Sequence, residues 1–300
     1  MTLWSRWVAR TSATEGATPL ALFRIGMGIS VLVTLGSVWL HGLVPVLWVD
    51  QAHGGYRALG QGPWLVALLG GPQPAVVWPL LGAASVCGLL LLLGIGGRGV
   101  ALLTLLTTKG LVDINGHAGG SYDELLANGL WLLVLGNGQA TLSVSAWRQT
   151  GDWWPRAEVL AFPRWLAAFQ LVLMYSMTGV QKLSVHWVPG GDASALYYIL
   201  QQPTWQRVDM AWLAWVFPLT QLATLITWFW EVLSPLWLLA MWCPAVRGAW
   251  QLRAAFAAVG LILHISIFVT MDVGPFTLIS LAFYPAMVHP WELRRLTGRG

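Results

Sequence analysis

The sequence predicts an all-α protein, a polytopic bundle of about eight transmembrane helices with the N- and C-termini in the cytoplasm. Of the 300 residues, 57% are hydrophobic and only 9% are charged, whereas an ordinary soluble domain has about 25% charged residues. Apolar runs follow one another from Pro19 to His289 without a polar stretch long enough for a second domain. We therefore expect a single membrane domain over residues 1–300, with its core at 18–290 and no soluble domain at the C-terminus.

The apolar runs give the expected order of the spans, since a helix needs roughly 20 mainly apolar residues to cross a bilayer. The first run lacks a small-residue cleavage site, so we expect it to be retained rather than removed as a signal peptide. The expected spans are 18–40, 74–97, 99–115, 122–138, 164–183, 214–241, 253–272 and 275–290. The third, fourth and eighth are short and require tilt or a re-entrant turn. Segment 60–70 is shorter and Gly-rich, and we expect it at the membrane interface.

The charged residues predict the orientation of the spans. With the N-terminus inside, the inner segments hold Arg6, Arg10, Arg98, Arg148, Arg156, Arg164, Arg247, Arg253, Arg294, Arg295 and Arg299. The outer segments then hold the acidic residues Asp50, Asp113, Asp123, Glu124, Asp192, Asp209 and Asp272. Because cytoplasmic loops are enriched in Lys and Arg, this asymmetry predicts a multi-pass protein of the cell (inner) membrane. It also argues against nucleic acid as a partner, since the Arg residues are spread over short loops.

Lys182 is the first candidate for a catalytic residue. It ends the fifth expected span, where helical spacing places Tyr175, Thr178 and Lys182 on one face. A lysine in a dehydrated pocket is favoured as the neutral amine and can act as a general base. The alternative is a lysine that snorkels from a helix end to the interface. The chain has only two lysines, Lys109 and Lys182, and uses Arg elsewhere; because Arg does not release its proton, this usage favours a chemical role.

A second polar cluster lies between the third and fourth expected spans. Its members are Asp113, Asn115, His117, Tyr122, Asp123, Glu124 and Asn128. Such a cluster can line a substrate pocket or bind a metal; we expect a pocket lining and no metal. The sequence Ser121-Tyr-Asp-Glu124 also has the pattern of a capping box, in which Glu124 would cap the following helix.

Three further ionisable residues are expected within spans, namely Arg24, Glu231 and His264. Glu231 belongs to a polar stripe at helical spacing that faces the bundle interior or a cavity; its other members are Gln221, Thr224, Thr227 and Ser234. Glu231 and His264 either contribute to a functional site or hydrogen-bond to each other. Arg24 pairs either with Glu231 or with backbone carbonyls.

The stretch around Lys182 resembles a known family. Residues 175–200, YSMTGVQKLSVHWVPGGDASALYYIL, are similar to the signature of vitamin K-dependent γ-glutamyl carboxylase and its bacterial relatives, the horizontally transferred transmembrane (HTTM) domain proteins. The matching residues are Gly179, Lys182-Leu183, Trp187 and Gly190. Residues 21–28 (ALFRIGMG), Asn115 to Tyr122, and WEVLSP with the later His264 resemble further parts of the family pattern. The resemblance covers roughly residues 18–290.

The resemblance implies a reaction and a set of site residues. Lys182 would deprotonate reduced vitamin K or another hydroquinone, which O2 converts to an epoxide. The base formed in that step removes a proton from a glutamate γ-carbon, and the carbanion captures CO2. His117 matches a histidine implicated in carboxylation, and the site lies on the extracytoplasmic side. The substrate would be a glutamate of a peptide or protein, and the pocket residues would be Asn115, Tyr122, Tyr175, Trp187, Glu231, His264 and Arg24.

The sequence departs from the family pattern at two points, and two other functions are alternatives to the carboxylase interpretation. The family has a lysine pair where this chain has Gln181-Lys182, and we expect no counterpart of the large C-terminal lumenal region of the eukaryotic enzyme. One alternative is a non-catalytic membrane component that binds the lipid bilayer, a lipid or quinone, or a secreted peptide partner. The other is a transporter with Glu231 and His264 as a proton relay, although we see no repeated halves. A closed pocket around Lys182 beside His117 would favour chemistry.

Overall fold

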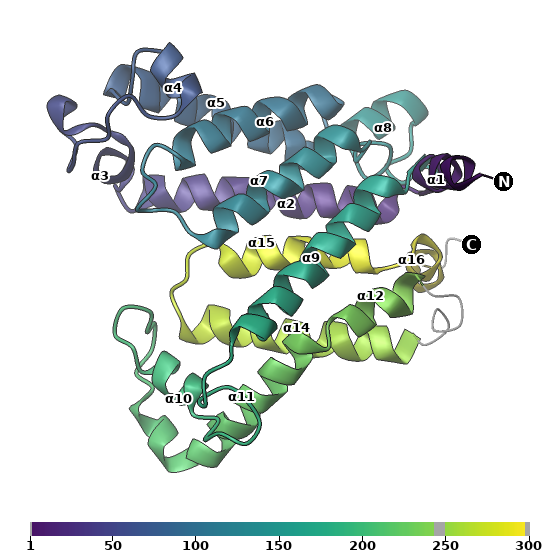
Figure 1. Ribbon diagram of the computed structural model, residues 1–300. Helices are drawn as coiled ribbons and strands as arrows, with labels where there is room; N and C mark the ends of the chain where they lie inside the picture. Colours follow the sequence, from purple (N-terminus) through teal and green to yellow (C-terminus); the bar gives the residue numbers. More distant parts are fainter. Residues whose placement is uncertain (1, 243–249, 298–300) are drawn as a thin grey trace. The chain divides into compact units, whose positions relative to one another are not determined.

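The computed structural model describes residues 2–242 and 250–297, most of which are helical. The chain divides into two compact units. Unit 1 comprises residues 1–167 and 278–300, and unit 2 comprises residues 168–277. The two boundaries fall within helices α9 (Phe162–Gln181) and α15 (Phe276–Ala282). Figure 1 shows the order of the helices along the chain. Arg247, Arg299 and Cys243 lie outside the described residues.

Unit 1 is built on four helices that follow one another in the sequence: α2 (Thr18–Leu40), α5 (Pro74–Leu93), α6 (Gly97–Val112) and α7 (Ser121–Leu135). Each packs against the next, and α7 also contacts α2. These helices agree with the first four expected spans to within a few residues. Their connections contain α3 (Val44–Trp48), η1 (Gln51–His53) and α4 (Trp64–Leu68), the last within the segment that was expected to be interfacial.

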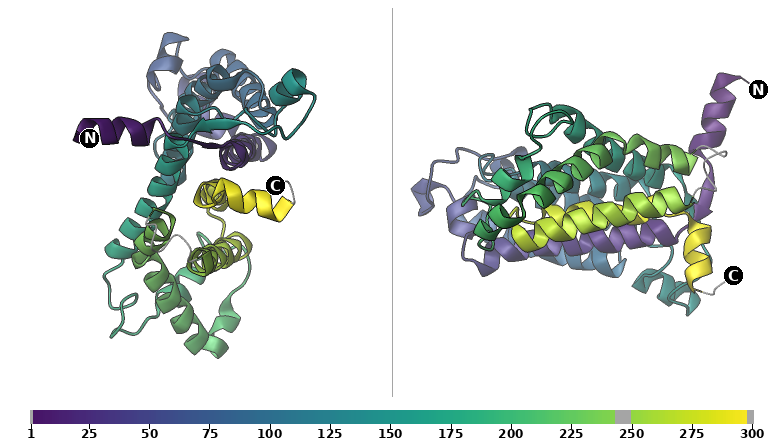
Figure 2. Two further views of the ribbon diagram at one scale, coloured as in Figure 1. Left: turned by 90° about the vertical axis from the view of Figure 1, so that its right-hand side faces the viewer. Right: turned by 90° about the horizontal axis from the view of Figure 1, so that it is seen from below.

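Unit 1 also contains four short helices outside this group. They are α1 (Leu3–Thr11), α8 (Val144–Thr150), η3 (Tyr284–Met287) and α16 (Pro290–Thr297). In Figures 1 and 2, α1 projects from the rest of the unit at the end marked N. Strands β1 (Thr14–Gly16) and β2 (Glu158–Leu160) pair antiparallel, with Thr14 opposite Leu160. The sequence did not predict this small sheet, because three-residue strands have no readable periodicity.

Arg24 is buried within unit 1 and binds the carbonyls at the C-terminal end of α5. Its guanidinium donates hydrogen bonds to the carbonyls of Leu91 and Leu92 at 2.7 and 2.6 Å, and to those of Gly138 and Leu142. The last carbonyls of a helix lack partners within the helix and carry partial negative charge, so a cation there is stabilising. Of the two partners considered for Arg24, the structure therefore shows backbone carbonyls.

Unit 2 contains the C-terminal part of α9, then α10 (Ala195–Leu200), η2 (Ala211–Val216), α11 (Phe217–Val232), α12 (Pro235–Trp242) and α14 (Trp250–Thr270). Helix α11 packs against α10 and α14, and α12 packs against α14. The expected span 214–241 is divided among η2, α11 and α12. The helix breaks before Pro235, which lacks an N–H and whose ring clashes with the preceding turn. The segment 275–290 is likewise divided, into α15 and η3.

Among the described residues, four helical segments are long and apolar enough to cross a membrane. They are Thr18–Leu40, Pro74–Leu93, Ala211–Val232 and Trp250–Thr270. The mostly helical fold and the presence of long apolar helices are thus confirmed. The count of eight spans and the cytoplasmic placement of the termini stay predictions.

Candidate functional site

The centre of the candidate site is an ion pair between Lys182 and Glu231 within unit 2. The chain leaves α9 at Gln181, and the Lys182 Nζ donates to both carboxylate oxygens of Glu231 at 2.6 Å. The side chain of Glu231, in the last turn of α11, is 6% exposed, and that of Lys182 is 22% exposed. Burying two charges is costly unless they are paired, so each residue depends on the other for its place in the interior.

Gly179 allows α9 and α11 to approach closely enough for this pair. A Cβ atom at Gly179 would lie 2.8 Å from the Glu231 Cβ and 2.8 Å from the Val232 backbone nitrogen. Trp187 then covers the amine, with its ring centroid 4.4 Å from the Lys182 Nζ. A cation over an indole face gains electrostatic stabilisation. The pair is therefore held between a helix packing contact and an aromatic ring.

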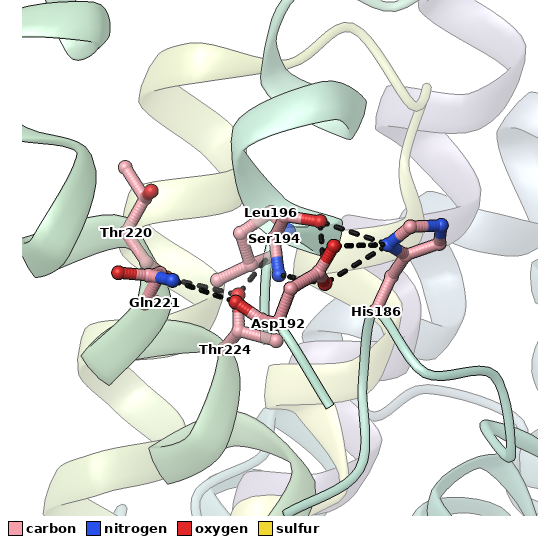
Figure 3. Close-up of polar contacts among 7 residues, drawn as sticks. All are labelled: His186, Asp192, Ser194, Leu196, Thr220, Gln221 and Thr224. Atoms are coloured by element: carbon pink, nitrogen blue, oxygen red, sulfur yellow. Dashed lines mark hydrogen bonds and ion pairs between the residues drawn. The ribbon is translucent and has the colours of Figure 1, made fainter. Parts of the chain in front are cut away.

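The loop that carries Trp187 is closed by a network of polar side chains (Figure 3). The His186 Nδ1 lies 2.9 Å from both Asp192 carboxylate oxygens and 2.9 Å from the Ser194 Oγ. The Ser194 Oγ also donates to Asp192 at 2.8 Å. Asp192 and Ser194 thus contact the same nitrogen of the His186 ring, Nδ1. In a Ser-His-Asp triad, serine and aspartate bind the two different ring nitrogens. This network therefore orders the loop and does not form a nucleophilic triad.

The same loop is anchored to the N-terminal half of α11. The Gln221 Nε2 donates to the Asp192 carbonyl at 2.7 Å, and the Leu196 N–H donates to the Thr224 Oγ1 at 3.2 Å (Figure 3). Gly191 is required here, because a Cβ atom at this residue would lie only 1.8 Å from the Val185 carbonyl oxygen. The polar stripe expected on α11 thus faces the interior of unit 2 at Thr224, Thr227, Glu231 and Ser234, all of which are buried.

A second buried pair joins α9 to α14. The Tyr175 hydroxyl lies 2.6 Å from the His264 Nε2, and the Tyr175 ring packs against Trp230 at a centroid distance of 4.5 Å. His264 therefore bonds to Tyr175, and not to Glu231 as the sequence had suggested as one alternative. The common helix face expected for Tyr175, Thr178 and Lys182 is not formed: Lys182 follows the end of α9, and Thr178 is exposed and donates to the Met174 carbonyl.

The other candidate residues lie in unit 1. Asn115 is buried, and its Oδ1 accepts from the His117 N–H at 3.2 Å, while His117 is exposed and Tyr122 is partly buried. The capping prediction was wrong in its residue. Helix α7 begins at Ser121, so Gly120 is the N-cap. The Asp123 carboxylate, one position before Glu124, accepts a hydrogen bond from the Gly120 N–H at 2.9 Å. The proximity of His117 to Lys182 that the resemblance implies stays a prediction.

Glu124 instead belongs to a charged cluster around the second lysine. The Lys109 Nζ lies 2.6 Å from Glu124 and 2.9 Å from Asp113. This cluster borders a groove of about 250 Å³ between α6 and α7, whose apolar walls include Trp64 and Trp131. Within the described part of the chain, no group of three His, Cys, Asp or Glu residues is placed to hold a metal ion.

Comparison with known proteins adds no constraint on this site. No protein-family model, no curated protein and no solved structure matches the chain. Sequence reasoning found Lys182, Trp187 and Glu231 separately, but missed that Lys182 and Glu231 form a pair. It also missed the network of His186, Asp192 and Ser194, although an Asp followed two residues later by Ser is a common turn-forming pattern.

Proposed function

We propose that the protein is a polytopic membrane enzyme of the HTTM and γ-glutamyl carboxylase type, in which the Lys182–Glu231 pair takes the proton of a hydroquinone. One observation supports this most directly: the single lysine of unit 2 is held by a buried carboxylate beside an indole ring. The resemblance of residues 175–200 to the family signature supplies the class of reaction.

The pair has the chemistry that proton abstraction needs. Transfer of the shared proton from the Lys182 Nζ to Glu231 leaves a neutral amine with a free electron pair. That amine can accept the hydroxyl proton of a bound hydroquinone, and the ammonium ion so formed stabilises the oxyanion that remains. Burial of the Glu231 carboxylate favours the neutral form of the pair, since neutral groups lose less hydration on burial than ions.

The residues around the pair fit a planar aromatic ligand. The Trp187 ring offers a flat surface next to the reacting nitrogen, on which a hydroquinone ring can stack. Reduced vitamin K would supply, on reaction with O2, the strong base that glutamate carboxylation by CO2 requires. In this proposal Tyr175 and His264 hold α9 against α14 through their hydrogen bond. The roles of His117, Asn115 and Tyr122 are proposed from the resemblance alone. Arg24 is left out of the centre because its donors are used by backbone carbonyls.

The test is a hydroquinone epoxidation assay on the purified full-length protein in detergent. Lys182→Ala is expected to lower turnover roughly 10²- to 10⁴-fold, the usual effect of losing a general base. Lys182→Arg keeps a positive charge beside Glu231 but cannot release a proton, so it should be similarly inactive. Lys109→Ala removes the other lysine and is the matched control, with turnover close to wild type. Absence of turnover in the wild type, or full activity in Lys182→Arg, would remove the enzyme proposal.

A second candidate function rests on the break between α11 and α12. Glu231 lies in the last turn before this break, and transporters often bind substrates and coupling ions at interrupted membrane helices. If epoxidation is absent, uptake driven by a pH gradient in proteoliposomes is the next measurement. Loss of such uptake in Glu231→Gln would support transport. Absence of both activities would favour a non-catalytic protein that binds a lipid, a quinone or a peptide.

A further inference from the structure

Two exposed tryptophans fix the depth of the Lys182–Glu231 pair along α11. Trp212 and Trp215, in the η2 turn before α11, are 54% and 90% exposed. Tryptophan side chains concentrate at the membrane interface, so these rings mark that level. At a rise of 1.5 Å per residue, Gln221 lies about 9 Å and Glu231 about 24 Å further along the helix. In a hydrocarbon layer about 30 Å thick, the pair therefore lies inside the layer, well away from the level of these two rings.

The loop after Lys182 returns from this depth toward the interface beside α11. Lys182 contacts Glu231, Leu196 contacts Thr224, and Asp192 contacts Gln221, so the loop covers about 15 Å of the helix by its rise per residue. Much of this segment, from 182 to 194, is irregular backbone. Irregular backbone occurs at membrane depth only where it is buried in protein or lines a water-filled cavity.

This loop is not buried in protein at its charged positions. The His186 side chain is 49% exposed, and the Asp192 side chain that pairs with it is 52% exposed. An ionisable side chain in contact with hydrocarbon is strongly unfavourable, so such residues face the protein interior or water. The exposed surface of this pair therefore faces water.

We propose that a water-filled inlet, lined by His186, Asp192 and Gln221, leads from one membrane face to the Lys182–Glu231 pair. The inlet admits protons and small polar solutes, while an apolar ligand reaches the pair from the lipid. His186 is then a positioning residue that orders the loop through Asp192. The inference shares with the proposed function only the membrane placement of α11, and it does not depend on hydroquinone chemistry.

Cysteine accessibility tests the inlet on the full-length protein in lipid vesicles. Both native cysteines are replaced by serine, and single cysteines are introduced by His186→Cys, Asp192→Cys and Ser184→Cys. The matched controls are Ile226→Cys and Leu222→Cys on α11. Ile226 is 47% exposed and Leu222 is 54% exposed, close to the values for His186 and Asp192. The probe is a charged, membrane-impermeant thiosulfonate, which needs water to reach and ionise the thiol.

The loop positions are expected to react at least tenfold faster than the matched α11 positions. Because exposure is similar in the two groups, such a difference reports water against lipid. Ser184→Cys changes one exposed side chain that lies outside the His186–Asp192 network, so it remains informative if the other loop variants fold poorly.

Equal, slow reaction at all positions would overturn the inlet. Equal, fast reaction would also overturn it, because α11 would then lie in water. Neither outcome depends on epoxidation, so failure of the inlet and failure of the enzyme proposal are distinguishable.

Discussion

Lys109 and Lys182 both bind carboxylates, and the surroundings of the two groups separate their roles. The Lys109 ammonium meets two carboxylates, and its side chain is 30% exposed beside a Glu124 that is 69% exposed. Such a surface cluster carries a net negative charge and is well hydrated. Lys182 meets one carboxylate that is almost fully buried, so the pair is neutral as a whole and can exist with its proton on either partner. The sequence offers only two lysines as candidate bases, and the buried carboxylate partner of Lys182 makes Lys182 the better candidate.

Removing one member of the buried pair should cost more stability than removing both. Glu231→Gln leaves the Lys182 ammonium without its counter-charge, and loss of one partner of a buried pair costs about 3–5 kcal/mol. Because Lys182 is partly exposed, we expect the lower end of this range. The double variant Lys182→Met with Glu231→Leu replaces the pair by apolar side chains and should recover most of the loss. Thermal unfolding in detergent measures both. A double variant that is less stable than Glu231→Gln would contradict a neutral, isolated pair.

The hydrogen bonds of Asp50 predict that the local stability of the segment after α3 depends on pH. Its carboxylate accepts the backbone N–H groups of Leu59 at 2.6 Å and Ala52 at 2.8 Å. These hydrogen bonds, that from Leu59 most strongly, hold the pKa of Asp50 below its ordinary value. Because the folded pKa is lower than the unfolded one, the stabilisation is complete above the unfolded pKa and is lost as pH falls through the folded pKa.

Hydrogen exchange at the Leu59 amide measures this effect. Protection is expected to decrease in acid in the wild type, whereas Asp50→Asn, which cannot ionise, should give protection that does not follow this titration. Wild-type protection that is constant down to strongly acidic buffer would show that the Asp50 carboxylate does not hold the segment.

The contact between α9 and α11 predicts the effect of adding one methyl group. In Gly179→Ala the new Cβ would overlap with Glu231 and Val232, so the helices must separate. Overpacking of this kind typically costs about 1–3 kcal/mol, and separation should also weaken the Lys182–Glu231 pair. Gly82→Ala in α5 is the matched control, since no atom lies within 4 Å of its added Cβ. If both variants unfold at the same temperature, close helix packing at Gly179 is not required.

At the level of elements, the sequence predicted helices better than it predicted their partners. Long apolar runs located α2, α5, α6 and α7 to within a few residues, and the spacing of Thr224, Thr227 and Glu231 indicated the buried face of α11. The pairing of Lys182 with Glu231 joins residues 49 positions apart and depends on how α9 and α11 approach, which no local pattern encodes. The capping error at Asp123 came from placing the N-cap one residue too late.

Two long helices of unit 2 bury polar side chains and expose apolar ones, the reverse of what is usual in a soluble protein. Within unit 2, α11 buries Thr224 and Glu231 while it exposes Leu222 and Ile226. Helix α14 likewise buries His264 and leaves large apolar residues exposed, namely Leu261, Ile262, Ile265, Phe268 and Val269. Exposed apolar surface of this extent marks contact with a membrane or a partner. Together with the long apolar helices, this distribution favours a bilayer as the solvent of unit 2.

The topology of unit 1 gives a prediction for the molecule as a whole. Helices α6 and α7 have 16 and 15 residues, so each is about 24 Å or less in length and shorter than a hydrocarbon layer of about 30 Å. The arginine asymmetry nevertheless predicts that both helices cross the membrane, with the loop around His117 outside and Gly151 inside.

Reporter fusions after His117 and after Gly151 should therefore be active on opposite membrane faces. A fusion after Arg57 serves as the control for the outer face, because two long apolar helices flank that segment. If the reporters after His117 and Gly151 are active on the same face, α7 does not cross, and the eight-span arrangement fails even though the helices themselves are present.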